Sequence, residues 1–180
     1  MEIIKTPIEG LLVVKPAVYY DGRGYFFESY NEKRFKENGI TDIFVQDNQS
    51  LSQQGVVRGL HFQCPPYEQA KLVRVIQGSV LDVAVDIRKK SPTYGKYFSI
   101  VLSADNFLQF YIPAGFAHGF VALEENTIFA YKCSQFYNKA SEDSIRYDDP
   151  LLNIDWKIKA SVISDKDLIG HYFKDFISKF

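Results

Sequence analysis

Two stretches decide the fold of this chain: Gly55-Val-Val-Arg58-Gly-Leu-His61-Phe-Gln63 and, later, Ile112-Pro113-Ala-Gly115-Phe-Ala-His118-Gly119-Phe120. Together they contain two of the three histidines. Each stretch places a histidine among β-branched and aromatic residues, beside glycines that permit tight turns. The two stretches are therefore predicted to contain β-strands, and their histidines are candidate site residues.

Short β-rich segments separated by turn residues recur along the whole chain. The clearest is Val80–Arg88, in which apolar residues alternate with Asp82, Asp86 and Arg88, so one face is predicted to be core and the other polar. Further strands are predicted at Leu11–Val18, Tyr25–Tyr30, Phe44–Asn48, Val57–Phe62, Lys71–Ile76, Tyr97–Leu102, Phe107–Ile112, Gly119–Leu123 and Thr127–Cys133. The number of strands favours an all-β barrel or sandwich with a few short peripheral helices, and the form that the pattern of the two opening stretches implies is a jelly-roll barrel.

One helix has recognisable ends. Asn31 is suited to cap a short helix that ends at Gly39, with Phe35 on its inner side. One or two more short helices are expected near the C-terminus.

Composition limits the classes of function. The chain has 180 residues, 46% of them apolar and 16% aromatic, which is enough for a packed core in one domain over residues 1–180. A formal charge of -1 gives no strong field, so neither nucleic acid nor an anionic membrane is an expected partner. No apolar run reaches the ~20 residues of a membrane span. Cys64 and Cys133 either pair or stay free, and we expect free thiols in the cytoplasm.

Three polar side chains have two interpretations each. Arg58 and His61 are three residues apart, so they face opposite sides of a strand unless a bulge lies near Gly59. Taken alone, His61 is more commonly a core histidine with its hydrogen bonds satisfied, and Arg58 is compatible with a surface ion pair. Lys71 is either a solvated strand end, which spacing alone favours, or an electrostatic stabiliser at the edge of the barrel interior.

The two opening stretches resemble the two-part pattern of the cupin barrel, Gly-x5-His-x-(His/Gln) followed by Pro-x-Gly-x2-His. Gln63 stands where a metal-binding cupin has a second histidine, so no metal and no cofactor are expected. A metal-dependent cupin remains an alternative. It needs at least three histidine or carboxylate ligands on one side of the metal, and the chain has only three histidines, His61, His118 and the remote His171. A catalytically silent cupin that only binds sugar nucleotides is a third class.

Over almost its whole length the chain resembles the dTDP-4-dehydrorhamnose 3,5-epimerase family. The matching segments are Asp21-Gly-Arg23-Gly-Tyr-Phe-Phe-Glu28-Ser-Tyr, Phe44-Val-Gln46-Asp47-Asn48-Gln-Ser, Val57-Arg58-Gly-Leu-His61-Phe-Gln63, Gln69-Ala-Lys71-Leu-Val, Asp82-Val-Ala-Val-Asp86-Ile-Arg88, Ser91-Pro-Thr, Ile112-Pro-Ala-Gly-Phe-Ala-His118-Gly-Phe, Tyr131-Lys132 and Ser164-Asp-Lys166-Asp167. The resemblance implies a homodimer whose subunits share strands, no metal, and a dTDP-linked 4-keto-6-deoxy sugar as substrate. A relative that inverts only C3 or C5, or that uses another sugar nucleotide, is the near alternative.

The resemblance also implies the roles of four residues. The C4 ketone of the sugar acidifies the hydrogens on C3 and C5, so a base removes one and leaves an enolate that is reprotonated from the opposite face. By resemblance His61 is the base and Asp167 its carboxylate partner, and an imidazole with an ordinary pKa near 6.5 suits this task. Tyr131 matches the proton donor, and Lys71 matches a residue that stabilises the enolate. Without the resemblance, Asp167 is as readily a helix-initiating acid and Tyr131 a buried aromatic.

Substrate-binding positions follow from the same matches. Arginine binds phosphate through a planar fork, and Arg23 and Arg58 match the arginines that hold the pyrophosphate. Phe136 or Tyr137 is expected to stack on the base. The other matched positions are Glu28, Gln46, Asp47, Asn48, His118, Glu142 and Lys166.

Overall fold

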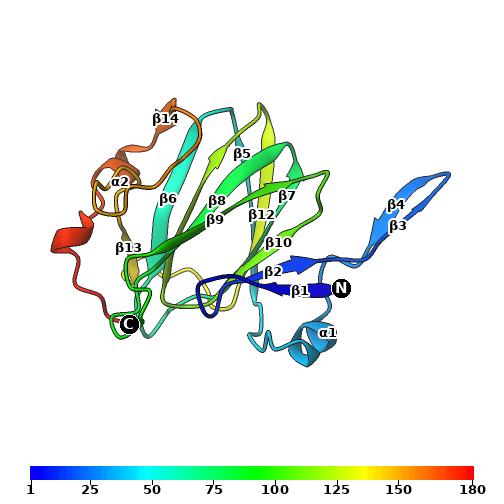
Figure 1. Ribbon diagram of the computed structural model, residues 1–180, viewed down its shortest axis with the longest axis horizontal. Coiled ribbons are helices and arrows are strands. Elements are labelled where there is room, and N and C mark those ends of the chain that lie inside the picture. Colours follow the sequence, from blue (N-terminus) through cyan, green and yellow to red (C-terminus); the bar gives the residue numbers. More distant parts are fainter.

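Two antiparallel sheets face each other and enclose the barrel interior (Figure 1). The computed structural model describes residues 1–180. The first sheet contains β1 (Glu2–Lys5), β2 (Leu12–Lys15), β5 (Gln46–Ser52), β7 (Lys71–Gln77), β10 (Gln109–Ile112) and β12 (Thr127–Cys133), in the order β1-β2-β10-β7-β12-β5. The second contains β6 (Val56–Gln63), β8 (Ser79–Asp86), β9 (Tyr97–Ser103), β11 (Phe116–Ala122) and β13 (Glu142–Ser144), in the order β13-β6-β11-β8-β9, with β14 (Val162–Ile163) beside β6. The prediction of an all-β jelly roll is confirmed.

The strand β8 is buried on both faces, which corrects one expectation. Leu81, Val83 and Val85 pack under the C-terminal part of the chain, in a cluster that includes Trp156. The opposite face, which was predicted to be polar, is buried as well. Asp82 and Asp86 are both completely buried: the facing sheet packs over the Val80 and Ala84 part of this face, and the Arg88–Thr93 segment covers Asp86.

Several strand boundaries differ from the predicted ones. The segment expected as one strand over Leu11–Val18 ends at Lys15, because Pro16 has no N–H for a sheet ladder. A separate hairpin follows, β3 (Val18–Asp21) and β4 (Gly24–Phe27), and it projects from the barrel (Figure 1). The strand expected over Phe44–Asn48 begins later, at Gln46, and the one expected over Gly119–Leu123 begins earlier, at Phe116. β1, β3, β13 and β14 were not predicted.

The helices are short, as expected. In α1 (Glu32–Glu37) the side chain of Asn31 accepts a hydrogen bond from the backbone N–H of Arg34, and Phe35 is buried. Gly39 follows with a φ of 88°, a left-handed conformation that favours glycine. Near the C-terminus lie α2 (Asp165–Leu168) and the 3-10 helix η1 (Phe173–Asp175). None of these helices has the length and apolar character needed to cross a membrane.

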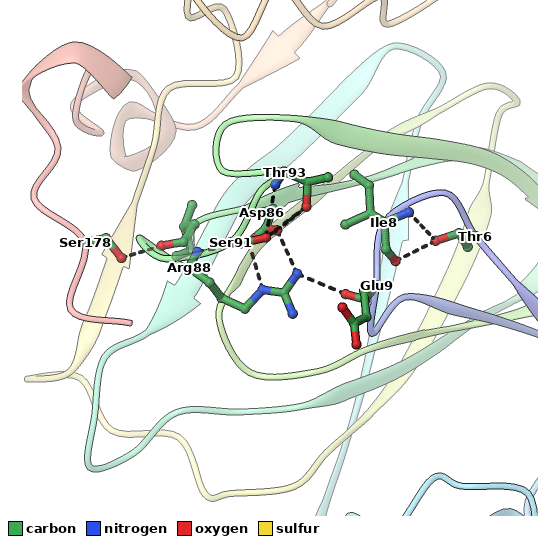
Figure 2. A network of polar contacts seen from close by, with 9 residues as sticks. Thr6, Ile8, Glu9, Asp86, Arg88, Ser91, Thr93 and Ser178 are labelled. Atoms are coloured by element: carbon green, nitrogen blue, oxygen red, sulfur yellow. Dashed lines mark hydrogen bonds and ion pairs between the residues drawn. The ribbon is translucent and has the colours of Figure 1, made fainter.

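Asp86 joins distant parts of the chain at one end of β8 (Figure 2). Its carboxylate accepts hydrogen bonds from the Arg88 guanidinium (2.9 and 2.7 Å), from Ser91 Oγ (2.5 Å) and from Thr93 Oγ1 (2.6 Å). The same guanidinium donates to the carbonyl of Glu9 at 2.9 Å. Burial alone would raise the pKa of Asp86, but the hydrogen bonds from these residues outweigh it and lower the pKa to about 2.

Asp86→Asn is therefore expected to lower the free energy of unfolding at neutral pH by about 2 kcal/mol or more. Because the folded pKa lies below the unfolded value, this stabilisation is present above about pH 4 and is lost as the pH falls toward about 2. Urea unfolding at neutral pH and at about pH 3 measures the change, and the difference from wild type should be smaller at the acid pH. The exposed Asp155, changed to Asn, is the control. An Asp86→Asn protein as stable as wild type at neutral pH would contradict the assignment.

Candidate active site

A bulge in β6 brings Arg58 and His61 to the same side of the sheet. His118 of β11 pairs with His61, and Phe120 pairs with Arg58, so β6 has one extra residue between the two pairs. Gly59 lies in this bulge with a φ of 138°, and a Cβ there would come within 2.5 Å of the Gly119 Cα atom. Only glycine fits this position, and the bulge is the one that the spacing of Arg58 and His61 required.

His61 and Asp167 form a close pair. The Nε2 atom of His61 lies 2.5 Å from the Oδ1 atom of Asp167, across 106 positions of sequence. Ser164 positions the aspartate by capping α2, since its Oγ accepts a hydrogen bond from the Asp167 backbone N–H at 3.2 Å. Burial raises the pKa of Asp167, but the hydrogen bond and positive charge of His61, together with hydrogen bonds from Ser164 and the Gly59 backbone, outweigh it, so the net pKa lies below its ordinary value. An ionised Asp167 can fix the tautomer of His61 and stabilise its imidazolium form.

The pair opens into a cavity of about 570 Å³ between the two sheets. β6 and β12 belong to facing sheets, so His61 and Tyr131 come from opposite walls. A second cavity of about 270 Å³ is also lined by His61, Lys71 and Tyr131, and it adds Gln46, Asn48, Gln63, Tyr137 and Glu142. Besides His61 and Tyr131, the larger cavity is lined by Arg58, Lys71, His118, Lys166 and Asp167.

Lys71 lies in the cavity wall, so its interpretation as a solvated strand end is wrong. Its Nζ atom is 5.8 Å from the centroid of the Tyr131 ring. Burial lowers the pKa of Lys71, and the pKa of Tyr131 is raised, chiefly by burial as well. A cation and a phenol hydroxyl thus share a partly buried region of the cavity wall. Electrostatic interactions are strong in such surroundings.

Arg58 and His118 are each held by a neighbour. Arg58 donates from Nε to Ser52 Oγ at 3.1 Å and from Nη2 to the Leu51 carbonyl at 3.2 Å, which fixes its guanidinium at the cavity wall. His118 Nε2 lies 2.9 and 3.0 Å from the two carboxylate oxygens of Asp82. Sequence reasoning missed Asp82 as a site residue, although an acid on the inward face of an apolar strand is a detectable signal.

The side chain of Gln63 forms hydrogen bonds with the backbone of neighbouring loops. It donates to the Tyr67 carbonyl at 2.6 Å and accepts from the Asn138 backbone N–H at 2.7 Å. In the structure, no group of three or more His, Cys, Asp or Glu residues is arranged to hold a metal ion. The ligand set that a metal-dependent cupin requires is therefore not assembled.

Some of the other predicted binding residues line the smaller cavity, and the rest are exposed outside it. Glu142 pairs with Lys166 and accepts a hydrogen bond from Tyr137 Oη at 2.8 Å, at the mouth of the smaller cavity. Gln46 donates to Asn48 at 3.1 Å in the same cavity. Asp47 instead points to the outer face of β5 and pairs with Lys132 at 3.0 Å. The side chains of Phe136 and Tyr137 are exposed.

Arg23 and Glu28 lie outside the cavities of their own chain. Arg23 lies in the turn between β3 and β4, where its side chain is 91% exposed and pairs with Asp21 at 2.5 Å. Glu28 follows the hairpin and pairs with Arg34 at 3.1 Å. The structure thus brings together the four positions predicted to be catalytic, His61, Tyr131, Asp167 and Lys71, but leaves Arg23 and Glu28 apart from them within one chain.

The jelly roll and the cavity with its His–Asp pair, lysine and tyrosine define the class of this protein as a cupin-type isomerase. The family model of dTDP-4-dehydrorhamnose 3,5-epimerase matches residues 5–175, and the chain belongs to this family. A dTDP-4-dehydrorhamnose 3,5-epimerase from Shigella flexneri is 50% identical over 176 residues, which cover 97% of each chain.

Two solved structures are similar along most of their length. The dTDP-4-dehydrorhamnose 3,5-epimerase of Elizabethkingia anophelis NUHP1 aligns with a TM-score of 0.93 and 52% identity, covering 97% of each chain. The dTDP-6-deoxy-D-glucose-3,5-epimerase of Legionella pneumophila, in complex with dTDP-4-keto-L-rhamnose, aligns with a TM-score of 0.90 and 51% identity, covering 94% of this chain and 90% of the other.

Proposed function

We propose that this protein converts dTDP-4-dehydro-6-deoxy-D-glucose to dTDP-4-dehydro-L-rhamnose by inverting C3 and C5, without a metal or a cofactor. One observation carries the proposal: the His61–Asp167 pair and Tyr131 face one cavity from opposite sheets. A base and an acid on opposite sides of a sugar ring are what inversion by proton transfer requires. The Legionella relative was solved with dTDP-4-keto-L-rhamnose, which is the product proposed here.

The proposed chemistry uses four side chains in turn. His61 removes the proton from C3 or C5, the C–H electron pair moves toward C4, and the ketone becomes an enolate. Asp167 stabilises the imidazolium that results. Lys71 stabilises the negative charge on the enolate oxygen, because a fixed cation in a partly buried cavity acts strongly on developing charge. Tyr131 then delivers a proton to the opposite face of the carbon, which restores the ketone with inverted configuration.

Product analysis tests the function. The purified protein is incubated with nucleotide-linked 4-keto-6-deoxy sugars and the products are identified by NMR. The dTDP-linked D-gluco substrate should be preferred and should be inverted at both carbons, with the rate unchanged by a chelator. Inversion at C3 or C5 alone would support the near alternative, and strong inhibition by chelator that a divalent metal reverses would support a metal-dependent cupin. No turnover of any sugar would contradict the proposal.

The nucleotide half of the substrate is proposed to lie between two subunits. Arg58 binds the pyrophosphate from the cavity wall, with His118, Gln46, Asn48, Glu142 and Lys166 as further contacts and Phe136 or Tyr137 against the base. Arg23 and Glu28 reach the substrate from the hairpin of a second copy in a homodimer, and Asp47 contributes from its strand. The exposed aromatic residues of the hairpin, Tyr19, Tyr20, Tyr25 and Phe26, support this dimer, since a projecting apolar hairpin is suited to dock on a partner.

Arg23→Ala is expected to raise KM by about tenfold or more while kcat stays near wild type, because the pyrophosphate is held alike in the ground and transition states. Steady-state kinetics measures the two constants, with Lys33→Ala on the exposed side of α1 as the control. A wild-type KM for Arg23→Ala would place the pyrophosphate elsewhere.

Mixed dimers test whether the arginine acts across the interface. When Arg23→Ala and His61→Asn chains are co-expressed, the mixed dimer contains one site with both wild-type residues if the hairpin serves the partner. Activity at low substrate concentration should then exceed that of either variant alone. Activity that only averages the two variants would show that each hairpin serves its own subunit.

The proposal also covers the domain organisation of the chain, its cellular location and its partners. Residues 1–180 act as one domain, and the family model spans most of them. A cytoplasmic location is supported by Cys64 and Cys133, which are buried and unpaired as is usual in a reducing compartment. The absence of a nucleic-acid partner stays a prediction.

A further inference from the structure

The strand β8 carries two carboxylates with very different surroundings. Asp82 and Asp86 are four residues apart on the same face, and both are completely buried. Asp86 receives hydrogen bonds from three side chains (Figure 2). Asp82 receives hydrogen bonds only from His118. The two residues therefore allow a matched comparison. Several hydrogen bonds offset the cost of burying the Asp86 carboxylate, whereas one side chain alone bonds to the buried Asp82 carboxylate.

Asp82 lies in apolar surroundings. Its neighbours on the same face of β8 are Val80 and Ala84, and its partner in β11 is Phe120. Burying a carboxylate with a single donor group is costly unless another positive charge lies near. Burial raises the pKa of Asp82 above its ordinary value, although the hydrogen bond and charge of His118 and the charge of Lys71 oppose that change. The pKa of Asp86 instead lies below its ordinary value, because its hydrogen bonds outweigh burial.

Lys71 is the complementary case, a half-buried cation in the cavity wall that forms no salt bridge with a carboxylate. Burial lowers its pKa, and the negative charges near it oppose that change. The titratable groups that face Lys71 and His118 come from five strands: Cys133 and Tyr131 of β12, Asp82 of β8, Glu142 of β13, His118 of β11 and His61 of β6. Of the carboxylates among them, Asp82 is the completely buried one and is bonded to a cavity residue.

We propose that Asp82 is a positioning residue for the epimerisation, which holds the His118 ring in one orientation and supplies the negative charge that keeps Lys71 protonated beside the substrate ketone. This inference rests on the proposed function. Asp82 does not line the cavity itself, whereas His118 and Lys71 do. It therefore acts through its neighbours. The His118 ring is fixed on one edge by the carboxylate and stacks on Phe129, with 6.2 Å between ring centroids.

The test is the pH dependence of kcat for wild type, Asp82→Asn and the matched control Asp86→Asn. Asparagine keeps the shape of the side chain and removes its charge. Lys71 should then lose its proton at lower pH, so the fall of kcat on the alkaline side should move down by about one pH unit, with kcat at pH 8 reduced by about tenfold or more. Asp86→Asn is expected to unfold more easily but to keep the wild-type pH profile, measured well below its melting temperature.

A folded Asp82→Asn enzyme with the wild-type profile would overturn the proposal, as would an equal displacement in Asp86→Asn. Lys71→Arg gives an independent check if Asp82→Asn does not fold. Because a guanidinium stays protonated above about pH 12, the alkaline fall should leave the measured range in Lys71→Arg. A fall at the wild-type pH in that variant would also overturn the proposal. Wild type is assayed in parallel, so loss of the proposed function itself appears as an inactive wild type.

Discussion

His61→Asn is expected to lower kcat by at least about 10²–10⁴-fold, the range attributed to a positioned general base. Asparagine can still donate a hydrogen bond to Asp167, so the buried carboxylate keeps a partner and the fold should persist. It cannot accept a proton at neutral pH. Substrate affinity, measured by calorimetry with dTDP, should stay near wild type because the nucleotide does not depend on this imidazole.

His171→Asn is the matched control. His171 also pairs with a carboxylate, Asp143 at 3.1 Å, but it does not line either of the cavities that His61 lines. This substitution should leave kcat within about twofold of wild type, since surface changes away from special features have small effects. Equal losses in the two variants would point to a general disturbance of the fold and would contradict the role assigned to His61.

Tyr131→Phe is expected to separate the two proton transfers. The ring still packs in the cavity wall, but the hydroxyl that delivers the proton is gone, so inversion should fall by about 10²–10⁴-fold. Proton removal by His61 can continue, because Lys71 still stabilises the enolate. In D2O the variant should therefore exchange hydrogen for deuterium with retained configuration. The measurement is NMR of the recovered sugar.

Tyr94→Phe provides the control for that substitution. Tyr94 packs on Phe173, with 5.1 Å between ring centroids, outside the cavities of the site. Its loss of a hydroxyl should change neither exchange nor inversion. A Tyr131→Phe enzyme that inverts its substrate at the wild-type rate would exclude the phenol as proton donor.

The central strands were predictable because their patterns are strong. β7 and β12 were predicted almost to the residue, since each is a run of β-branched and aromatic residues between turn signals. β13 and β14 have only three and two residues, too few to show a period. The polar face of β8 was recognised, but its burial depends on the facing sheet, which a local pattern cannot reveal.

Part of the candidate site was predictable from local sequence, and the rest depends on contacts between residues far apart in the chain. The three-residue spacing of Arg58 and His61 placed them on opposite faces unless a bulge lay near Gly59, and the structure shows that bulge. The pairing of His61 with Asp167 spans 106 positions, and only the family resemblance indicated it before the structure. Spacing alone favoured a solvated Lys71, because a charged residue at a strand end is usually exposed. The cavity between the two sheets is what buries it.

Position-resolved deuterium incorporation tests most directly whether one base serves both carbons. In D2O, wild type should place deuterium at both C3 and C5, and His61→Asn should abolish exchange at both positions, because the same imidazole removes both protons as the sugar ring reorients. Tyr131→Phe should still exchange. If His61→Asn exchanges C5 at a near wild-type rate while Tyr131→Phe does not, the roles of base and acid are the reverse of those proposed.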